Sequence, residues 1–306
     1  MGKKSKANRK KAPVATAAVT ATAAVAVVAT ATAATETKRG EFPESTVFVK
    51  GESFFKKGNY AKAQKIYLQG LEHGCVPCMT NYALQVLVDG ATIDTMDEEM
   101  IQDNRNLHLA LPLLLEGAIR GSAQAISPLL DVYSYAIGLT AAPIILYWMK
   151  HYSKNYDRGD GRKKQSYERN MKEDIGTACS ECRKEDSETV TLMKCEGCHL
   201  CFYCSKECQQ KMWQEGHAGV CRHLGILQKY HKPFAKKIWK DIAVHGIPPQ
   251  DIPELQELRQ QLGLSRPQAD YQDLLEAVQA GRLDLTQLIL PRKDGTVQIG
   301  SFPRPI

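Results

Sequence analysis

The feature that most constrains this chain is a cluster of cysteines just beyond its middle. Eight of the ten cysteines lie between positions 179 and 221, and seven of them combine with one histidine into four ligand pairs. The pairs are Cys179/Cys182, Cys195/Cys198, Cys204/Cys208 and His217/Cys221. A C-x-x-C turn lets two thiolates reach one metal ion, and an i, i+4 spacing places two ligands on one face of a helical turn. The spacing therefore indicates a metal-binding segment.

These ligands predict two closed zinc sites. A structural zinc ion takes four nitrogen or sulfur ligands, so one site would be all-thiolate and the other would combine three thiolates with an imidazole. Neither site keeps an open position for a substrate. Because a segment of about 45 residues buries too few apolar side chains to form a core, the metal would supply its folding energy. We expect a structural module that acts through its surface.

The alternative to zinc is a disulfide framework, which needs an oxidising compartment. Clustered cysteine pairs with a histidine among them favour zinc, and reduced, metal-bound thiols imply the cytoplasm, the nucleus or both. The spacing alone does not decide whether the four pairs are used in sequence or interleaved.

The segment resembles the MYND-type zinc finger over its whole length, 179–221. The matching residues are Cys179-Ser-Glu-Cys182, Cys195-Glu-Gly-Cys198, Tyr203-Cys204-Ser-Lys-Glu-Cys208-Gln209, Trp213 and His217-Ala-Gly-Val-Cys221. In that family the pairs interleave. The resemblance implies that one zinc is bound by Cys179, Cys182, Cys204 and Cys208, and the other by Cys195, Cys198, His217 and Cys221.

The chain departs from the family pattern at two places. The gap from Cys182 to Cys195 is long, and Gly216 adds one residue before His217. Both departures are expected in turns, where added length costs little.

Three nearby residues are expected not to bind metal. Cys201 forms overlapping C-x-x-C spacings with Cys198 and Cys204, so a shift in register that recruits it is the alternative. His199 and His223 are interpreted as solvent-facing neighbours of the ligands.

Trp213 lies on the helix predicted after Ser205, which can cap that helix. In a finger with little else to bury, this tryptophan is most simply a core residue. The resemblance implies a second interpretation, because Gln209 and Trp213 lie where MYND fingers receive short proline-containing peptides. Both interpretations remain open on the sequence alone.

The charge balance argues against a nucleic-acid interface. Lys plus Arg exceeds Asp plus Glu by 40 against 34, and six basic residues between positions 3 and 11 account for the whole excess. The segment 179–221 carries five basic and seven acidic side chains. Its helix offers Gln209, Gln210, Lys211 and Gln214 where a DNA-reading finger shows Arg and Lys. DNA is therefore not expected as a partner.

Residues 1–42 are expected to be a disordered tail, basic at its tip and rich in Ala and Thr. The tract from Ala12 to Thr35 is uncharged but contains no Leu, Ile or Phe, so membrane insertion would be poorly driven. A membrane is therefore not expected as a partner. The alternatives are a targeting or anchoring segment and, for the basic tip, a nuclear address.

From position 45 to 154 the apolar pattern is helical and is interpreted as a helical-repeat domain. Resemblance to the tetratricopeptide repeat is carried by Gly58-Asn59-Tyr60, Ala63, Tyr67 and Leu71. The segment also matches itself at an offset of 47 residues, pairing Ala63, Gly70, Gly74, Cys78 and Tyr82 with Ala110, Gly117, Gly121, Ala125 and Leu129. Repeated helical hairpins with glycine at the turn indicate a helical solenoid. The long period resembles the Sel-like relatives of tetratricopeptide repeats.

Cys75-Val-Pro-Cys78 has the spacing of a redox or metal pair. The second copy has Ser122 and Ala125 at the equivalent positions, so both cysteines are interpreted as small residues in a tight helix–helix contact. The acidic stretch Thr95–Asp103 is expected to be the loop between the copies.

The rest of the chain is divided into a charged linker, the finger and a helical C-terminal extension, at 155–176, 177–223 and 224–306. Asp251 and Glu254 predict a capping box for a helix ending near Gly263, and a further helix is expected from Ser265 to Gly281. A short strand is expected within Gly295–Phe302.

The predicted fold class is mainly α: a helical-hairpin repeat domain, a small two-zinc finger and a helical tail. The predicted function is a non-enzymatic adaptor that binds protein or peptide partners through the finger and the repeats, without a small-molecule substrate. MYND fingers also occur in lysine methyltransferases, but no SET-type cofactor motif and no nucleophile–base constellation outside the zinc ligands is visible. The alternatives are a membrane-tethered or nucleic-acid-associated factor acting through the N-terminal tail, or a remnant or partner of a methyltransferase system.

Overall fold

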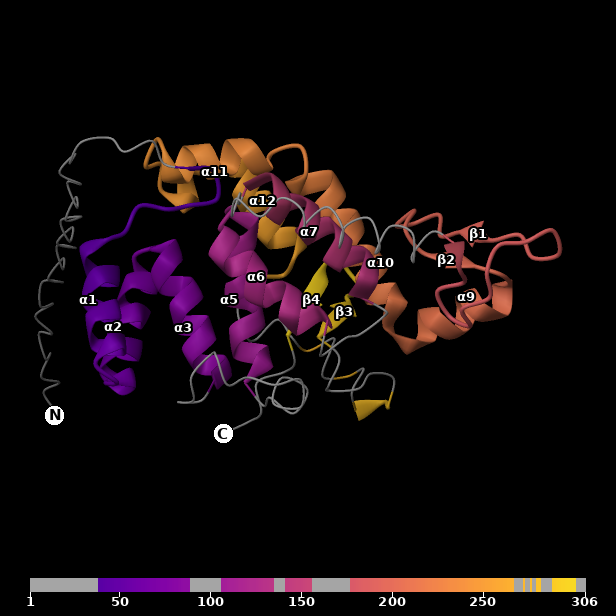
Figure 1. Cartoon of the computed structure of the whole chain (residues 1–306), viewed down its shortest axis with the longest axis horizontal. Coiled ribbons are helices and arrows are strands. Elements are labelled where there is room, and N and C mark those ends of the chain that lie inside the picture. Colours follow the sequence, from indigo (N-terminus) through magenta and orange to yellow (C-terminus); the bar gives the residue numbers. More distant parts are fainter. Residues whose placement is uncertain are drawn as a thin grey trace, which may run out of the picture. The chain divides into compact units, whose positions relative to one another are not determined.

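The structure is a computed structural model (Figure 1). It describes residues 38–88, 106–134, 141–155, 177–266 and 288–300, together with 272, 276 and 279–281. Every element below belongs to one unit of the chain, Glu36–Ile306. The described elements are mainly helical, in agreement with the predicted fold class.

The region before the finger is a succession of helices in which each packs on the next (Figure 1). They are α1 (Thr46–Lys56), α2 (Tyr60–Glu72), α3 (Val76–Val88), α5 (Leu107–Ile119), α6 (Ala123–Val132) and α7 (Ala142–Asn155). Serine caps fix two of the starts. The Oγ of Ser45 accepts a hydrogen bond from the backbone N–H of Phe48, and the Oγ of Ser122 accepts one from that of Ala125.

The two aligned hairpins make the same close contact. A Cβ on Gly70 would lie 2.3 Å from the Sγ of Cys78, and a Cβ on Gly117 would lie 2.7 Å from the Cβ of Ala125. The helices can approach this closely only because glycine has no side chain. Cys78 and Ala125 are both fully buried, which supports the interpretation of Cys78 as a small packing residue. Cys75 is half-buried and lies directly before α3, at the position that Ser122 takes before α6.

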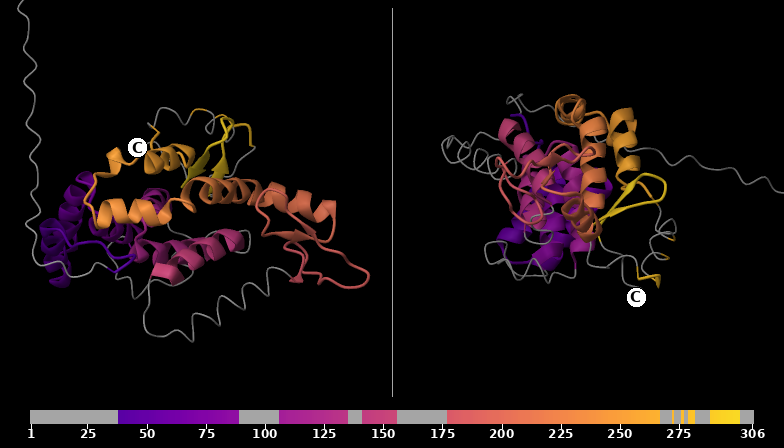
Figure 2. Two further views of the ribbon diagram at one scale, coloured as in Figure 1. Left: turned by 90° about the horizontal axis from the view of Figure 1, so that it is seen from above. Right: turned by 90° about the vertical axis from the view of Figure 1, so that its right-hand side faces the viewer.

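The finger and the residues after it add short strands and further helices. They are β1 (Met193–Lys194), β2 (Phe202–Tyr203), α9 (Lys206–Met212), the π-helical turn η4 (Trp213–His217), α10 (Ala218–Ile226), the π-helical turn η5 (Leu227–His231), α11 (Ala235–Ala243), the 3₁₀ turn η6 (Pro249–Asp251), α12 (Pro253–Gln261), β3 (Ile289–Pro291) and β4 (Val297–Ile299). β1 pairs antiparallel with β2, and β3 pairs antiparallel with β4 with Ile289 opposite Ile299. The β3–β4 hairpin lies along α10, as Figure 2 shows.

The C-terminal extension agrees with the sequence expectations in part. The expected strand is β4, but its partner β3 is not predicted from the sequence. α12 ends as predicted beside Gly263, whose φ is +72°. The predicted capping box of Asp251 and Glu254 is wrong. Asp251 is the last residue of η6, and Ile252 takes the N-cap position of α12 without a side-chain hydrogen bond. Glu254 pairs instead with Lys237 at 3.0 Å. The helix expected from Ser265 to Gly281 lies mostly outside the described residues.

One hydrophobic core joins the helical region, the finger and the C-terminal extension. Its fully buried members include Leu115 of α5, Trp148 of α7, Leu224 of α10, Leu258 of α12 and Val297 of β4. α10 contacts both α7 and β3. The last helix of the finger is therefore also a central element of the core.

His231 ties the C-terminal extension to two helices of the preceding region. Its Nδ1 accepts a hydrogen bond from the hydroxyl of Tyr147 at 2.6 Å, and its Nε2–H donates to the carbonyl oxygen of Ile119 at 3.1 Å. Complete burial lowers the pKa of His231 to about 3. The ring is therefore neutral, as one accepting and one donating nitrogen require.

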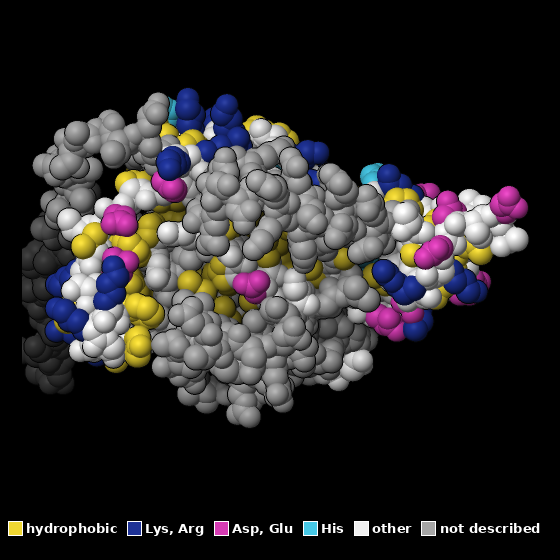
Figure 3. Space-filling view, in the orientation of Figure 1, with side chains coloured by type: hydrophobic (Ala, Val, Ile, Leu, Met, Phe, Trp, Pro, Cys, Tyr) yellow, Lys and Arg dark blue, Asp and Glu magenta, His cyan; other side chains and the backbone are white. Residues whose placement is uncertain are grey.

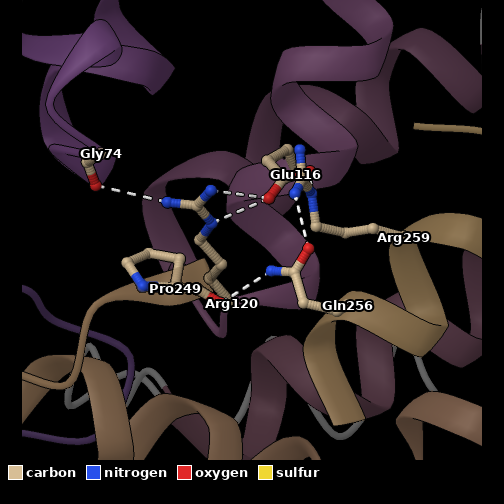
Figure 4. A network of polar contacts seen from close by, with 6 residues as sticks. All are labelled: Gly74, Glu116, Arg120, Pro249, Gln256 and Arg259. Atoms are coloured by element: carbon tan, nitrogen blue, oxygen red, sulfur yellow. Dashed lines mark hydrogen bonds and ion pairs between the residues drawn. The ribbon is translucent and has the colours of Figure 1, made fainter. Parts of the chain in front are cut away.

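A buried ion-pair network forms a second tie (Figure 4). Glu116 on α5 accepts hydrogen bonds from Arg120 at 2.9 and 2.7 Å through one carboxylate oxygen, and from Arg259 on α12 at 3.0 Å through the other. Arg120 also donates to the carbonyl oxygen of Gly74, in the turn between α2 and α3, at 3.3 Å. Glu116 and Arg120 are only 6% and 5% exposed, so these charges depend on one another for their solvation.

Several expectations fall outside the described residues. They concern the tail, including Ala12–Thr35, the loop Thr95–Asp103 and residues 156–176 of the linker. Among the helices that are described, none combines the length and the apolar character needed to cross a membrane.

We predict that Glu116→Ala destabilises the protein by about 3–5 kcal/mol, because the variant leaves the guanidinium of Arg120 buried without its counter-ion. The matched control is Glu52→Ala, which removes an exposed ion pair with Lys56 and should cost at most about 1 kcal/mol. Urea unfolding of the zinc-loaded chain, followed by helical circular dichroism, measures both. Equal effects of the two variants would contradict the prediction.

Candidate functional site

The four thiols of the first predicted zinc site converge. Cys179 and Cys182 lie in the loop before β1, Cys204 follows β2, and Cys208 lies in the first turn of α9. The Sγ atoms of Cys182 and Cys204 are 3.4 Å apart, and those of Cys204 and Cys208 are 3.6 Å apart. Cys179 is buried whereas Cys182 is exposed, so solvent reaches one side of this site.

The second predicted set converges in the interior. Cys195 and Cys198 lie between β1 and β2, His217 ends η4, and Cys221 lies in the first turn of α10. The Nε2 of His217 lies 3.5 Å from the Sγ of Cys195 and 3.8 Å from that of Cys198. The Sγ atoms of Cys195 and Cys221 are 3.9 Å apart. All four residues are buried, and the three cysteines belong to the hydrophobic core.

Both sets have the dimensions of a zinc site. Within each set, all four ligand atoms lie within 4.8 Å of one another. A tetrahedron with zinc–sulfur bonds of about 2.3 Å has sulfur–sulfur edges of about 3.8 Å, close to the separations above. All ten cysteines are free thiols. The pairs are thus interleaved, first with third and second with fourth, and the two sets fit two zinc ions.

Backbone N–H groups favour the thiolate form that zinc requires. Burial alone would raise the pKa of the Cys179 thiol, but hydrogen bonds from the backbone at Cys182 and Cys204 outweigh burial and lower the pKa to about 6. The two turns that bring these ligands together therefore also stabilise a charged sulfur between them.

His217 is oriented by a residue outside the ligand set. While its Nε2 faces the ligand thiols, its Nδ1 lies 3.6 Å from the Sγ of Cys201. A metal-binding histidine usually donates its second ring N–H to an acceptor, which fixes the tautomer and the ring orientation. Cys201 lies outside both ligand sets, as expected, and is a positioning residue. The overlapping cysteine spacing conceals this role in the sequence.

The other neighbours of the zinc ligands are His199, His223 and Ser205, and they differ in their exposure to solvent. His199 is exposed, as expected, with a φ of 56°. The expectation of a solvent-facing His223 is wrong, because α10 packs into the core and the ring lies fully buried, edge-on to Tyr133 at 6.3 Å. Burial lowers the pKa of His223 to about 3. Ser205 caps α9 as expected, with its Oγ accepting from the backbone N–H of Cys208 at 3.3 Å.

The extra residue before His217 is accommodated at a kink between two helical segments. α9 is followed directly by η4, in which Gly216 is not helical and has a φ of 122°. Glycine adopts this conformation without steric cost, so the chain bends at Gly216. The insertion is therefore absorbed locally, and Cys208 and His217 still face their own ligand sets.

Trp213 is not a core residue. Its side chain is 46% exposed, and its ring lies edge-on to His217 with the centroids 6.0 Å apart. The preceding Met212 is 4% exposed and fills the interior instead. Gln209, one turn earlier, is half-buried. The indole of Trp213 is thus accessible to a partner.

A groove begins at Trp213 and follows α10. Its volume is about 410 Å³, and both the finger and the C-terminal extension contribute to it. We call it the α10 groove, and its lining residues are Gly197, Trp213, Ala218, Cys221, Arg222, Gly225, Ile226, Lys229, Tyr230, Gln261 and Gly295.

The charged side chains of the finger are mixed in sign. On the face drawn in Figure 3, acidic and basic side chains are interspersed over this part of the molecule. Several pair with one another, such as Lys211 with Glu181 at 2.5 Å and with Glu215 at 3.7 Å. The described residues of the finger therefore form no continuous basic strip on this face of the kind that follows a phosphate backbone.

Comparison with known protein families identifies residues 179–221 as a MYND finger. The finger is a zinc-binding protein-interaction module, and its two Cys/His clusters fit two zinc ions. The match does not extend to the helices before it, so their resemblance to tetratricopeptide and Sel-like repeats stays a prediction. Searches of curated proteins and of solved structures gave no significant match to the chain.

We predict that the full-length chain binds two zinc ions, because each closed tetrahedral site takes one. Native mass spectrometry should show the mass of two zinc atoms. Cys204→Ser and Cys221→Ser should each lower the zinc content, since each removes a ligand from a different site, whereas Cys78→Ser should leave it unchanged. One zinc in the wild type, or two in both ligand variants, would refute the assignment.

Cys201→Ala should retain two zinc ions but bind the second more weakly, by about 10–100-fold, because the Nδ1–H of His217 loses its acceptor. Cys201→Ser keeps an acceptor and should show a smaller loss. Competition with a chelator of known affinity measures both variants. An Ala variant with wild-type affinity would mean that Cys201 does not orient the histidine.

Proposed function

We propose that the protein is a non-enzymatic adaptor whose finger docks short, proline-containing peptides of partner proteins on Gln209 and Trp213. The observation that carries this proposal is the 46% exposure of Trp213 at the mouth of the α10 groove. Tryptophan is among the residues that contribute most to protein interfaces when a partner covers them. Proline-containing segments dock on grooves lined by aromatic side chains.

Metal coordination would hold this docking site rigid. Cys208 immediately precedes Gln209 and belongs to the first ligand set, while His217 lies one turn after Trp213 and belongs to the second. Both ends of the segment are fixed before a partner arrives, so little conformational entropy is lost on binding. A proline-containing peptide is also partly ordered in advance, because it favours the polyproline II conformation.

The zinc sites support binding in place of catalysis. Each ligand set offers four protein atoms, which complete a tetrahedron and leave no position for a substrate. We therefore propose no reaction and no small-molecule substrate. Thiols that must stay reduced to bind zinc favour the cytoplasm or the nucleus.

The helices before the finger provide a second surface in this proposal. α1 and α2 each expose an apolar side chain, Val49 at 48% and Leu68 at 39%. The tetratricopeptide and Sel-like repeats that this region resembles stack their helices into extended binding surfaces. Two such surfaces would let one chain bring two partners together.

We predict that Trp213→Ala lowers the affinity for proline-containing peptides by roughly tenfold or more, as expected for an interface tryptophan. The measurement uses an array of proline-containing octapeptides and the labelled, zinc-loaded full chain. Phe234→Ala is the matched control, since Phe234 is 37% exposed and lies outside the groove.

Zinc content and the dispersion of amide resonances report on the fold of each variant. Loss of zinc in Trp213→Ala would assign the side chain a structural role. An intact fold with undiminished peptide binding would move the docking site to the helices before the finger.

A further inference from the structure

Gly225, the next-to-last residue of α10, where the chain continues into η5, has no packing reason to be glycine. Glycine inside a helix is destabilising relative to alanine, so it calls for a local cause. On the same helix the cause is clear for Gly219, where a Cβ would lie 2.3 Å from the carbonyl oxygen of Ile289. A Cβ on Gly225 would meet no atom within 4 Å. Any side chain at Gly225 would enter the α10 groove, which this residue lines.

The groove follows one face of the helix. Ala218, Arg222, Gly225 and Lys229 line it and recur every three or four residues, which places them in a row along α10 and η5. From Ala218 to Lys229 the row is about 16 Å long at a rise of 1.5 Å per residue. An extended peptide advances about 3.1 Å per residue, so about five of its residues cover the row. Trp213 precedes this row, so a peptide held at Trp213 reaches Lys229 at least about five residues further along.

The far part of the groove is cationic. Arg222 and Lys229 are exposed, and no Asp or Glu is among the lining residues. Arg222 donates one hydrogen bond to the carbonyl oxygen of Arg292 at 2.8 Å, which leaves most of its N–H groups for a ligand. The Nζ of Lys229 lies 4.8 Å from the ring centroid of Tyr230. A hydrogen bond with Tyr230 and the charge of Glu257 raise the pKa of Lys229, but among the described residues no carboxylate lies within ion-pair distance of either cation.

We propose that the α10 groove binds a partner peptide that carries an Asp or Glu at least about five positions from the residue docked on Trp213, with its carboxylate between Arg222 and Lys229. The inference rests on the proposed function and deepens it, because the selecting residues lie beyond the family segment 179–221. Gly225 leaves room for the peptide backbone between the two contacts. The C-terminal extension, through Gln261, closes the other side of the groove.

The test uses an array of octapeptides with one fixed proline and every other position varied, presented to the labelled, zinc-loaded full chain. We expect Asp or Glu to be selected at least about five positions from the proline. A selected peptide should bind about three- to tenfold more tightly than its Gln counterpart, and less so at high salt. The double variant Arg222→Gln/Lys229→Gln should lose this preference and keep the preference for proline. Lys236→Gln/Lys240→Gln is the control, because both lysines are exposed and lie outside the groove.

A second variant tests whether the groove at Gly225 must be empty for the peptide to bind, independently of charge. Gly225→Leu should keep two zinc ions and an unchanged or higher melting temperature, yet weaken binding of the selected peptide at least about tenfold by filling the groove. Gly225→Ala is the smaller step and should weaken binding less. Wild-type peptide binding by Gly225→Leu, or an acidic preference that survives the double charge variant, would overturn the inference and leave the proposed function standing.

Two other outcomes separate the two proposals. If no proline-containing peptide binds, or if binding does not depend on Trp213, the proposed function fails and the inference fails with it. If no peptide is selected but the chain self-associates in sedimentation and Gly225→Leu abolishes that association, the groove binds a second copy and the inference is overturned.

Discussion

The structure depends on a single helix that is held from two sides. α10 carries Cys221, a ligand of the buried zinc set, and one turn later Leu224, which is fully buried in the core. Zinc coordination therefore fixes the finger and also the direction in which the chain enters the core. A finger on a flexible linker would present Trp213 in many orientations. Here the shared helix orients the tryptophan relative to the elements that α10 contacts.

Polar groups hold the C-terminal extension in register against the other helices. Apolar surfaces tolerate small shifts, but the carboxylate of Glu116 is satisfied only where Arg120 and Arg259 both reach it. His231 acts in the same way, since its two nitrogens need a donor on α7 and an acceptor on α5. Such buried groups add little net stability because of their desolvation. We interpret them as fixing the position of α12 and η5, which form the far end of the α10 groove.

The sequence predicts the parts of this molecule that depend on local spacing. The ligand pairs follow from C-x-x-C and i, i+4 geometry, and the cap at Ser205 involves a backbone group only three residues away. The exposure of Trp213 and the burial of His223 depend on which side of a helix meets the core. A pattern of 3.6 residues per turn cannot give that answer here, because the non-helical Gly216 kinks the chain between the two residues and interrupts the helical phase.

Other features depend on contacts between residues far apart in the sequence, and no local sequence pattern indicates them. Glu116 and Arg259 are 143 positions apart, and nothing in either neighbourhood indicates that the other is its partner. The same holds for β3, whose short apolar sequence gains its strand conformation only beside β4 and α10. The groove itself is formed by segments on both sides of the finger boundary, so no motif confined to 179–221 contains it.

The unequal burial of the two ligand sets has a kinetic consequence. An exchanging ligand must reach the metal, and Cys182 in the first set is exposed whereas every ligand of the second set is buried. The first zinc would therefore exchange quickly and the second slowly. Losing the fast zinc releases Cys208 and the start of α9 beside Gln209, while Cys221 and the core remain in place. A chelator therefore reaches the ligand set beside Gln209 before it reaches the set that anchors α10 in the core.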